Sequence, residues 1–466
     1  MRNAFLLMTA SFAMGAAVAQ PIPFEQITEQ PFGEGVFEPS LSGDGSRVAF
    51  RSSSDLVGEN PDRSLEVFVY DSDTDTLSQV TSTPGGSGTS VTLPMIVPDG
   101  SRVIFRSIWD FIAEQPGSTF QLWEVDVDSG VYRQITSNPQ GTPVFDPRLS
   151  GDGQWAVFLA RINPTGQNAD GSLEVFRVRI ADGSLTQISN NNVVATEFPD
   201  INGDGTRIVW GDRANYDGTN TNSGLEIWLW DETQGITSVT DQQQGALQTN
   251  LPRIDHAGRF VSFISLFDFS GSGAIGRKVH VADTQSGTIE LITNPGVGGS
   301  GANVPDAEIA PDGSAVFFES NRQLGGLNPD SNRELWRYDI ATGEITQATD
   351  TTGGLSIIQL SDDATRRYVD ISANNRIAYR SDNSLEQGVT NLGGNIELYL
   401  SVLDDHCPAD VNGDGTLNDS DFFAWVTVFT ADPRSPQQEE DCDVNEDGIC
   451  SDSDFFAWVT AFGTGC

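Results

Sequence analysis

Short apolar runs alternate with polar residues along most of the chain, in a unit that recurs every 52 to 61 residues. Each unit opens with a Gly-Asp-Gly-like turn and an apolar run, as in SGDGSRVAF and NGDGTRIVW. A middle strand follows (LEVFVYD, LEIWLWD), then a short turn and a last strand (SQVT, RQIT). The opening runs end at Phe50, Phe105, Phe158, Trp210, Phe263, Phe318 and Tyr379. Seven units of about four alternating strands predict an all-β, seven-bladed β-propeller over residues 20–403.

The seventh unit is incomplete, because it stops after IELYL without a closing -Q-[IV]-T strand. Residues 24–28 (FEQIT) provide such a strand at the other end of the chain. We predict that this N-terminal strand closes the last blade, since closure removes an exposed strand edge.

Near the C-terminus, residues 410–429 and 443–462 repeat one 20-residue segment with fifteen identical positions. Each copy has oxygen-bearing side chains at positions 1, 3, 5 and 12 of a loop and Gly at position 6, the pattern of a 12-residue calcium loop. The predicted ligands of two Ca²⁺ ions are Asp410, Asn412, Asp414, Thr416, Asp421, Asp443, Asn445, Asp447, Ile449 and Asp454. Thr416 and Ile449 would contribute their carbonyl groups. Two complete copies favour this interpretation over ordinary Asp-Gly turns.

Each loop continues into FFAWV, whose apolar residues recur at helical spacing. We therefore predict a small α-helical, calcium-binding domain over residues 407–466, entered through a short linker at 404–409. All four cysteines lie in it: Cys407, Cys442, Cys450 and Cys466. Three disulfide pairings are open, and we favour Cys407–Cys466 with Cys442–Cys450, because the first would clasp both ends of a twofold module. A zinc site is the alternative, although the spacings match no zinc ribbon.

The N-terminus predicts export. Arg2 precedes an apolar segment from Ala4 to Ala16, and residues 17–19 read Ala-Val-Ala, a cleavage site. Residues 1–19 are thus predicted to be a signal peptide, and the mature chain is expected to be secreted, either extracellular or attached to the cell surface, with a periplasmic location also compatible. No later run approaches the 18 apolar residues of a membrane span.

The charge balance limits the partners. The chain has 25 Lys and Arg against 66 Asp and Glu, a formal charge of −41. Nucleic acid and anionic lipid would be repelled, so we expect neither as a partner.

Candidate catalytic residues are few. The three histidines are His256, His280 and His406, and neither GxSxG nor HExxH occurs. A pair of carboxylates could support glycoside hydrolysis, but sequence alone selects no pair, so we assign no catalytic residue. The Gly-Asp-Gly turns are interpreted as hairpin turns. The Asn- and Asp-rich loops at 59–64, 168–172, 215–224 and 328–332 are interpreted as solvated loops, with calcium or sugar binding as the alternative.

Two family resemblances follow from these residues. The duplicated DxNxDGxxxxxD loops with their following helices resemble a dockerin domain, which implies a cohesin-like protein or surface scaffold as partner. The positions that would face the cohesin are loop positions 10 and 11: Asp419, Ser420, Asp452 and Ser453. The repeats over residues 24–403 resemble TolB-like propeller repeats, which implies a ring that binds a protein or glycan.

Two functions are therefore expected. The first is a secreted, non-catalytic binding propeller tethered through a calcium-dependent dockerin. The alternative is a polysaccharide-active enzyme, a lyase or glycoside hydrolase, delivered by the same tail.

Overall fold

The computed structural model describes residues 22, 24–29, 35–85, 91–113, 119–192, 196–242, 249–271, 276–293, 307–324, 327–329, 331–351, 369–373, 376–381, 395–401 and Trp425. The chain divides into two compact units, Met1–Ser401 and Val402–Cys466. In the second unit only Trp425 is described, and it is buried. The predicted calcium ligands, cohesin-facing residues and cysteines, like the signal peptide, lie outside the described residues. Among the helical residues described, no segment meets the length and hydropathy of a membrane span.

In the described part of the first unit, 28 strands form seven four-stranded antiparallel sheets. Blades one to three are β2 (Val36–Leu41), β3 (Arg47–Ser52), β4 (Glu66–Asp71) and β5 (Thr76–Gln79); β6 (Val91–Ile96), β7 (Arg102–Ser107), β8 (Gln121–Asp126) and β9 (Tyr132–Gln134); and β10 (Phe145–Leu149), β11 (Trp155–Ala160), β12 (Glu174–Arg179) and β13 (Leu185–Gln187). Blades four and five are β14 (Glu197–Ile201), β15 (Arg207–Asp212), β16 (Glu226–Asp231) and β17 (Gly235–Ser238); and β18 (Thr249–Ile254), β19 (Phe260–Ser265), β20 (Lys278–Asp283) and β21 (Thr288–Leu291). Blades six and seven are β22 (Ala307–Ile309), β23 (Ala315–Ser320), β24 (Glu334–Asp339) and β25 (Ile345–Gln347); and β26 (Val369–Ile371), β27 (Ile377–Ser381), β28 (Glu397–Ser401) and β1 (Phe24–Gln26).

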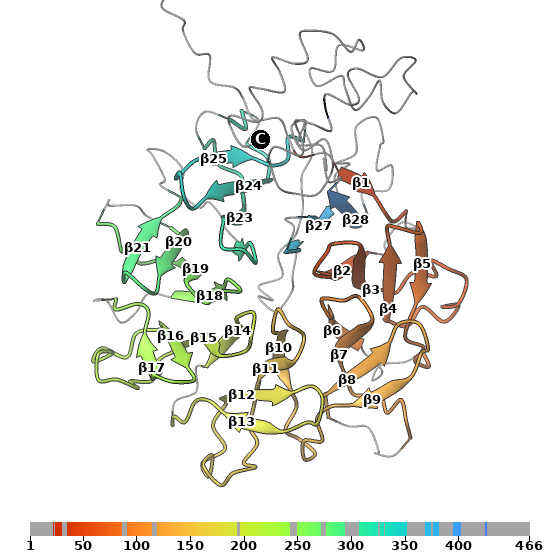
Figure 1. Cartoon of the computed structure of the whole chain (residues 1–466), viewed down its shortest axis with the longest axis horizontal. Helices are drawn as coiled ribbons and strands as arrows, with labels where there is room; N and C mark the ends of the chain where they lie inside the picture. The colour runs from red at the N-terminus through yellow and green to blue at the C-terminus, as the bar shows by residue number, and fades with distance from the viewer. Residues whose placement is uncertain are drawn as a thin grey trace, which may run out of the picture. The chain divides into compact units, whose positions relative to one another are not determined.

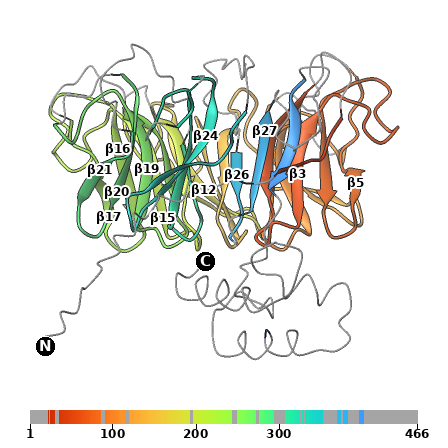
Figure 2. The same cartoon turned by 90° about the horizontal axis from the view of Figure 1, so that it is seen from above.

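The blades surround a central axis, and the first strand of each lies nearest to it (Figure 1). These first strands contact one another from blade to blade, whereas the fourth strands are the most exposed. Seen from the side, the blades stand next to one another with their strands running from one face of the ring to the other (Figure 2). The predicted all-β, seven-bladed propeller is confirmed.

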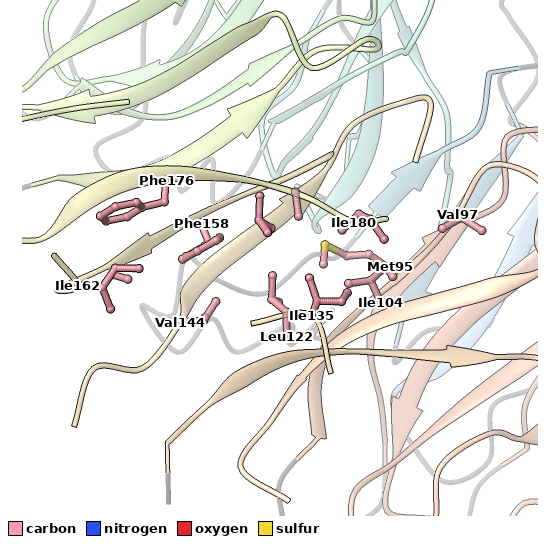
Figure 3. Close-up of a cluster of buried hydrophobic side chains, with 13 residues drawn as sticks. Met95, Val97, Ile104, Leu122, Ile135, Val144, Phe158, Ile162, Phe176 and Ile180 are labelled. Atoms are coloured by element: carbon pink, nitrogen blue, oxygen red, sulfur yellow. The ribbon is translucent and has the colours of Figure 1, made fainter. Parts of the chain in front are cut away.

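The alternation of each strand supplies two interfaces. In β11, Ala156 and Phe158 pack toward blade two, while Val157 and Leu159 pack toward blade four. Side chains on a strand alternate between its two faces, so both faces of a blade are apolar. Seven buried clusters result, one at each junction between neighbouring blades. Figure 3 shows the cluster between blades two and three, where Met95, Ile104 and Leu122 meet Phe158 and Phe176. Each such buried side chain contributes about 1.5–3 kcal/mol.

The N-terminal strand closes the ring, as predicted. β1 pairs antiparallel with β28, with Phe24 opposite Ser401. Thr28 then donates from its Oγ1 to Oε2 of the buried Glu397 over 2.6 Å. Within blade one, Thr81 makes the same contact to Glu66 over 2.5 Å. The closing strand therefore repeats a hydroxyl-to-glutamate hydrogen bond that blades one, three, four and six make within a continuous stretch of chain.

The Gly-Asp-Gly-like turns also join neighbouring blades. The glycines at 45, 100, 205 and 258 have φ of 71° to 75°, which favours glycine. An arginine of the preceding blade donates to the glycine carbonyl: Arg47 to Gly100 over 3.1 Å and Arg207 to Gly258 over 2.9 Å. A Cβ on Gly258 would lie 2.6 Å from Cδ of Arg207. The turns are hairpin turns, as predicted, and they are also interblade contacts.

Candidate functional site

A proline bulge shapes five of the seven innermost strands. The residue before each proline has φ between 46° and 56°, and the pairing with the second strand shifts there. The prolines are Pro39, Pro94, Pro147, Pro199 and Pro252. Proline cannot donate to the sheet and is tolerated at bulges, and a bulge redirects the side chains beside it. The residue after four of these prolines (Ser40, Met95, Arg148 and Asp200) lines the central cavity described below, whereas Arg253 lines a smaller hollow beside it.

We call the seven equivalent residues the channel ring. Each pairs with the second-strand residue that comes just before the recurring aromatic of that strand, as Ser40 pairs with Ala49, the residue before Phe50. Its members are Ser40, Met95, Arg148, Asp200, Arg253, Glu308 and Asp370. Two guanidinium groups and three carboxyl groups thus gather around the axis of the propeller.

Several members of the channel ring join neighbouring blades. The Nε of Arg253 lies 3.1 Å from Oε2 of Glu308, and the Arg253 side chain is 1% exposed. Asp200 accepts the backbone N–H of Ile254 over 2.9 Å, and Asp370 accepts that of Leu41 over 2.7 Å. Burial raises the pKa of Asp200, while the charges of Arg148 and Arg253 oppose that rise. These groups therefore stabilise one another as well as lining the axis.

A cavity of about 120 Å³ lies along the axis and is lined by residues of all seven blades. Arg148, Asp200, Glu308 and Asp370 contribute to its wall, and His256 stands at its rim, in the turn after β18. Arg148 also lines a second, smaller hollow of about 20 Å³ together with Arg253 and Asp146. Ionisable side chains from five blades therefore converge on this one part of the described chain.

His256 is held firmly by its backbone. Its N–H donates to the carbonyl of Pro311 in blade six over 2.8 Å, and its carbonyl accepts from Gly203 in blade four over 3.0 Å. Its imidazole reaches back across blade four to blade three, where a Cβ on Gly151 would collide with the ring. Glycine at 151 therefore provides the space that the imidazole occupies.

The surroundings of His256 favour a neutral imidazole. Desolvation by its neighbours lowers the pKa of His256, although part of the side chain meets solvent and the carboxylates of Asp200, Asp255, Asp152 and Asp312 oppose the shift. A neutral imidazole can accept a proton. Since Arg148 lines the same cavity, a proton acceptor and a positively charged residue both contribute to this site.

The Asn-rich loops lie at the opposite end of the blades from this cavity, because they follow the second strand rather than the first. The side chains of Asn60 and Asn168 are buried and donate to the carbonyls of Ser64 and Ser172 over 2.8 and 2.9 Å. Asn220 does the same to Gly224. These amides stabilise their own loops, which favours the structural interpretation over a calcium site or sugar-binding rim.

His280 lies away from the cavity, inside β20 as predicted. It occupies the position of the third-strand aromatics such as Phe68 and Trp228, stacked 5.2 Å from Phe263. Its side chain is fully buried, and burial lowers its pKa to about 4. We assign His280 to the core.

Sequence reasoning placed His256 in the turn of blade five, where the structure has it, but it identified neither the channel ring nor the cavity that His256 lines. One signal was present: a proline recurs at 39, 94, 147, 199 and 252, always one residue before the ring position. Three carboxyl-bearing residues of the channel ring, Asp200, Glu308 and Asp370, line the axial cavity. Across the described residues, no group of three or more His, Cys, Asp and Glu side chains is arranged to hold a metal ion.

No protein-family model and no curated protein matches the chain. Solved structures do. An oligogalacturonate lyase in complex with manganese has 14% identity and a TM-score of 0.53, covering 86% of this chain and 98% of that one. An oligogalacturonate lyase from Vibrio parahaemolyticus has 12% identity and a TM-score of 0.54, covering 82% and 96%.

A structure from a study of two prolyl endopeptidases has 12% identity and a TM-score of 0.50, covering 81% of this chain and 51% of that one. At such identities the likeness concerns the fold. Together with the sheet topology, it defines the class of this protein as a seven-bladed β-propeller.

Proposed function

We propose that the chain is a secreted polysaccharide-active protein whose ring binds an oligosaccharide at the axial cavity. The observation that carries the proposal is the convergence of His256, Arg148, Asp200, Glu308 and Asp370 on one cavity lined by all seven blades. Ligand sites of enzymes are concave and contain a few convergent polar groups with shifted pKa values. The fold-level likeness to two oligogalacturonate lyases supports a carbohydrate substrate.

The reaction that these groups suit best is β-elimination on a uronate residue. In that reaction a base takes the proton from the carbon beside the carboxylate, the glycosidic C–O bond at the next carbon breaks, and a double bond forms between the two carbons. The departing oxygen keeps the electron pair of the broken bond and takes a proton from water. His256 would accept the proton, and Arg148 would neutralise the substrate carboxylate. The charge of −41 opposes long uronate polymers, so we expect short substrates and a rate that rises as salt screens the repulsion.

The test is an assay of the mature chain on short neutral and uronate oligosaccharides. Two quantities are measured: the ultraviolet absorbance of unsaturated ends and the total number of reducing ends. The proposal predicts unsaturated ends, lost in His256→Gln and kept in the core control His280→Phe. Reducing ends without absorbance would indicate hydrolysis by the ring carboxylates instead. Turnover unchanged in His256→Gln would contradict the role of His256.

The second candidate function is non-catalytic binding, and one observation favours it. Arg253 is paired with Glu308, and Asp200 and Asp370 each accept a backbone N–H of the next blade. Groups engaged in this way hold the ring together without any reaction. Binding of an oligosaccharide or protein without turnover in the assay above would support this candidate.

We further propose that the tail tethers the ring to a cohesin-like protein or surface scaffold through two bound Ca²⁺ ions. The support is the duplicated loop pattern of residues 410–421 and 443–454. The full-length chain should bind its scaffold in calcium buffer and release it in chelator. The variant Asp410→Ala/Asp443→Ala should fail to bind in either buffer.

A further inference from the structure

Two hollows meet at His256. The axial cavity described above is one. The other is an open groove of about 530 Å³ on the face of the Gly-Asp-Gly turns, lined by residues of blades three, four and five such as Asp152, Asn202, Arg207 and Gln285. Of all the residues that line either hollow, Gly151 and His256 line both. These two residues therefore form the boundary between the groove and the cavity.

The contacts of His256 place the imidazole across this boundary. Its backbone is fixed by blades four and six through Gly203 and Pro311. From there the imidazole lies over Gly151 in blade three, so closely that no side chain fits at that position. His256 is an exposed residue and lines the open groove, so its imidazole can turn outward into the groove.

We propose that His256 is a gate: its imidazole closes the groove side of the axial cavity, and a ligand enters from the groove by displacing it. A side chain needs only a rotamer change for this, which occurs rapidly in exposed residues. The gate also places the imidazole against any ligand that passes. The inference concerns only access to the cavity. The gate can therefore fail its test while the proposed function holds, and the proposed function can fail while the gate holds.

A buried thiol can test the gate without any substrate. Ser40 is 2% exposed, lines the axial cavity and does not line the groove. All cysteines of the chain lie at 407 or beyond, so Ser40→Cys in the full-length protein gives the ring one thiol. Its reaction with N-ethylmaleimide can be followed by mass spectrometry of the peptide that contains residue 40.

We expect slow labelling of Ser40→Cys with His256 present and labelling at least about 10-fold faster after His256→Gly. Gly151→Ala should also speed labelling with the histidine intact, because its Cβ displaces the imidazole from its place over residue 151. Gln285→Ala, which changes only the groove wall, is the matched control and should not change the rate. Equal rates with and without the imidazole in folded protein, or rapid labelling already with His256 in place, would overturn the proposal.

Discussion

At the scale of residues, blade five differs from the other blades of the propeller at two equivalent positions of its third strand. Blade five has Lys278 where blades such as one and four have the buried glutamates Glu66 and Glu226, and His280 where the other blades have Phe, Trp or Tyr. Lys278 donates from Nζ to the carbonyls of Leu266 and Gly276 over 2.9 and 2.8 Å. The side chain at this position therefore still forms hydrogen bonds, although it carries a positive charge where the glutamates carry a negative one.

His280 should make the ring sensitive to acid. Burial lowers its pKa from 6.5 to about 4 in the folded state, so the unfolded chain binds the proton first. The unfolding free energy should therefore fall by about 3 kcal/mol as the pH drops from about 6.5 to about 4. Denaturant titrations at several pH values should show this slope in wild type and its loss in His280→Phe, which restores the aromatic of the other blades. The same slope in both proteins would contradict the assignment.

Arg253 provides a second prediction at this scale. Arg253→Met leaves Glu308 without its ion pair beside the axis, and removing one partner of a buried pair costs roughly 3–5 kcal/mol. The double variant Arg253→Met/Glu308→Leu should recover much of that loss. Arg259→Met is the surface control, since that arginine is 45% exposed in its pair with Asp283, and it should change stability by no more than about 1 kcal/mol. Thermal or denaturant unfolding measures all three, and a neutral Arg253→Met would refute the structural role.

At the scale of elements, the closing strand is the most informative feature. Thr28→Ala removes a hydrogen bond to the buried Glu397 and should lower the unfolding free energy by about 1–3 kcal/mol. The matched control is Thr81→Ala, which removes the equivalent bond to Glu66 in blade one. In that blade all four strands belong to one continuous stretch of chain. Deletion of residues 21–30 should cost more than either variant, because it removes the whole fourth strand of blade seven. A deletion that leaves the unfolding transition unchanged would contradict closure by β1.

The strands could be predicted from the periodicity of the sequence. The channel ring and the axial cavity could not. Both faces of a blade are buried, so apolar alternation and a closing Thr or Ser recur along the chain and identify Thr28 as a strand end. The channel ring has no such constraint, because its members contact one another or a backbone N–H of the next blade rather than a partner that recurs in every unit. Its members range from Met95 to Arg148, and a preceding proline marks their register in five of the seven blades.

At the scale of the whole molecule, the two units should respond independently to calcium. If the tail folds around two ions, metal binding supplies its folding free energy, while the ring rests on its seven apolar junctions. Calorimetry should show a transition that chelator abolishes and a second one that chelator leaves in place. Asp410→Ala/Asp443→Ala should reproduce the effect of chelator. Loss of both transitions, or of neither, would contradict this division.

The central claim is that ligands meet this propeller at the axial cavity. Hydrogen–deuterium exchange of the mature chain, with and without the oligosaccharide that gives the strongest response in the activity panel, tests it most directly. The account predicts added protection in residues 145–155, 197–207 and 249–260, which surround His256. Protection confined to the Asn-rich loops at 59–64, 168–172 and 215–224, on the opposite face, would contradict it.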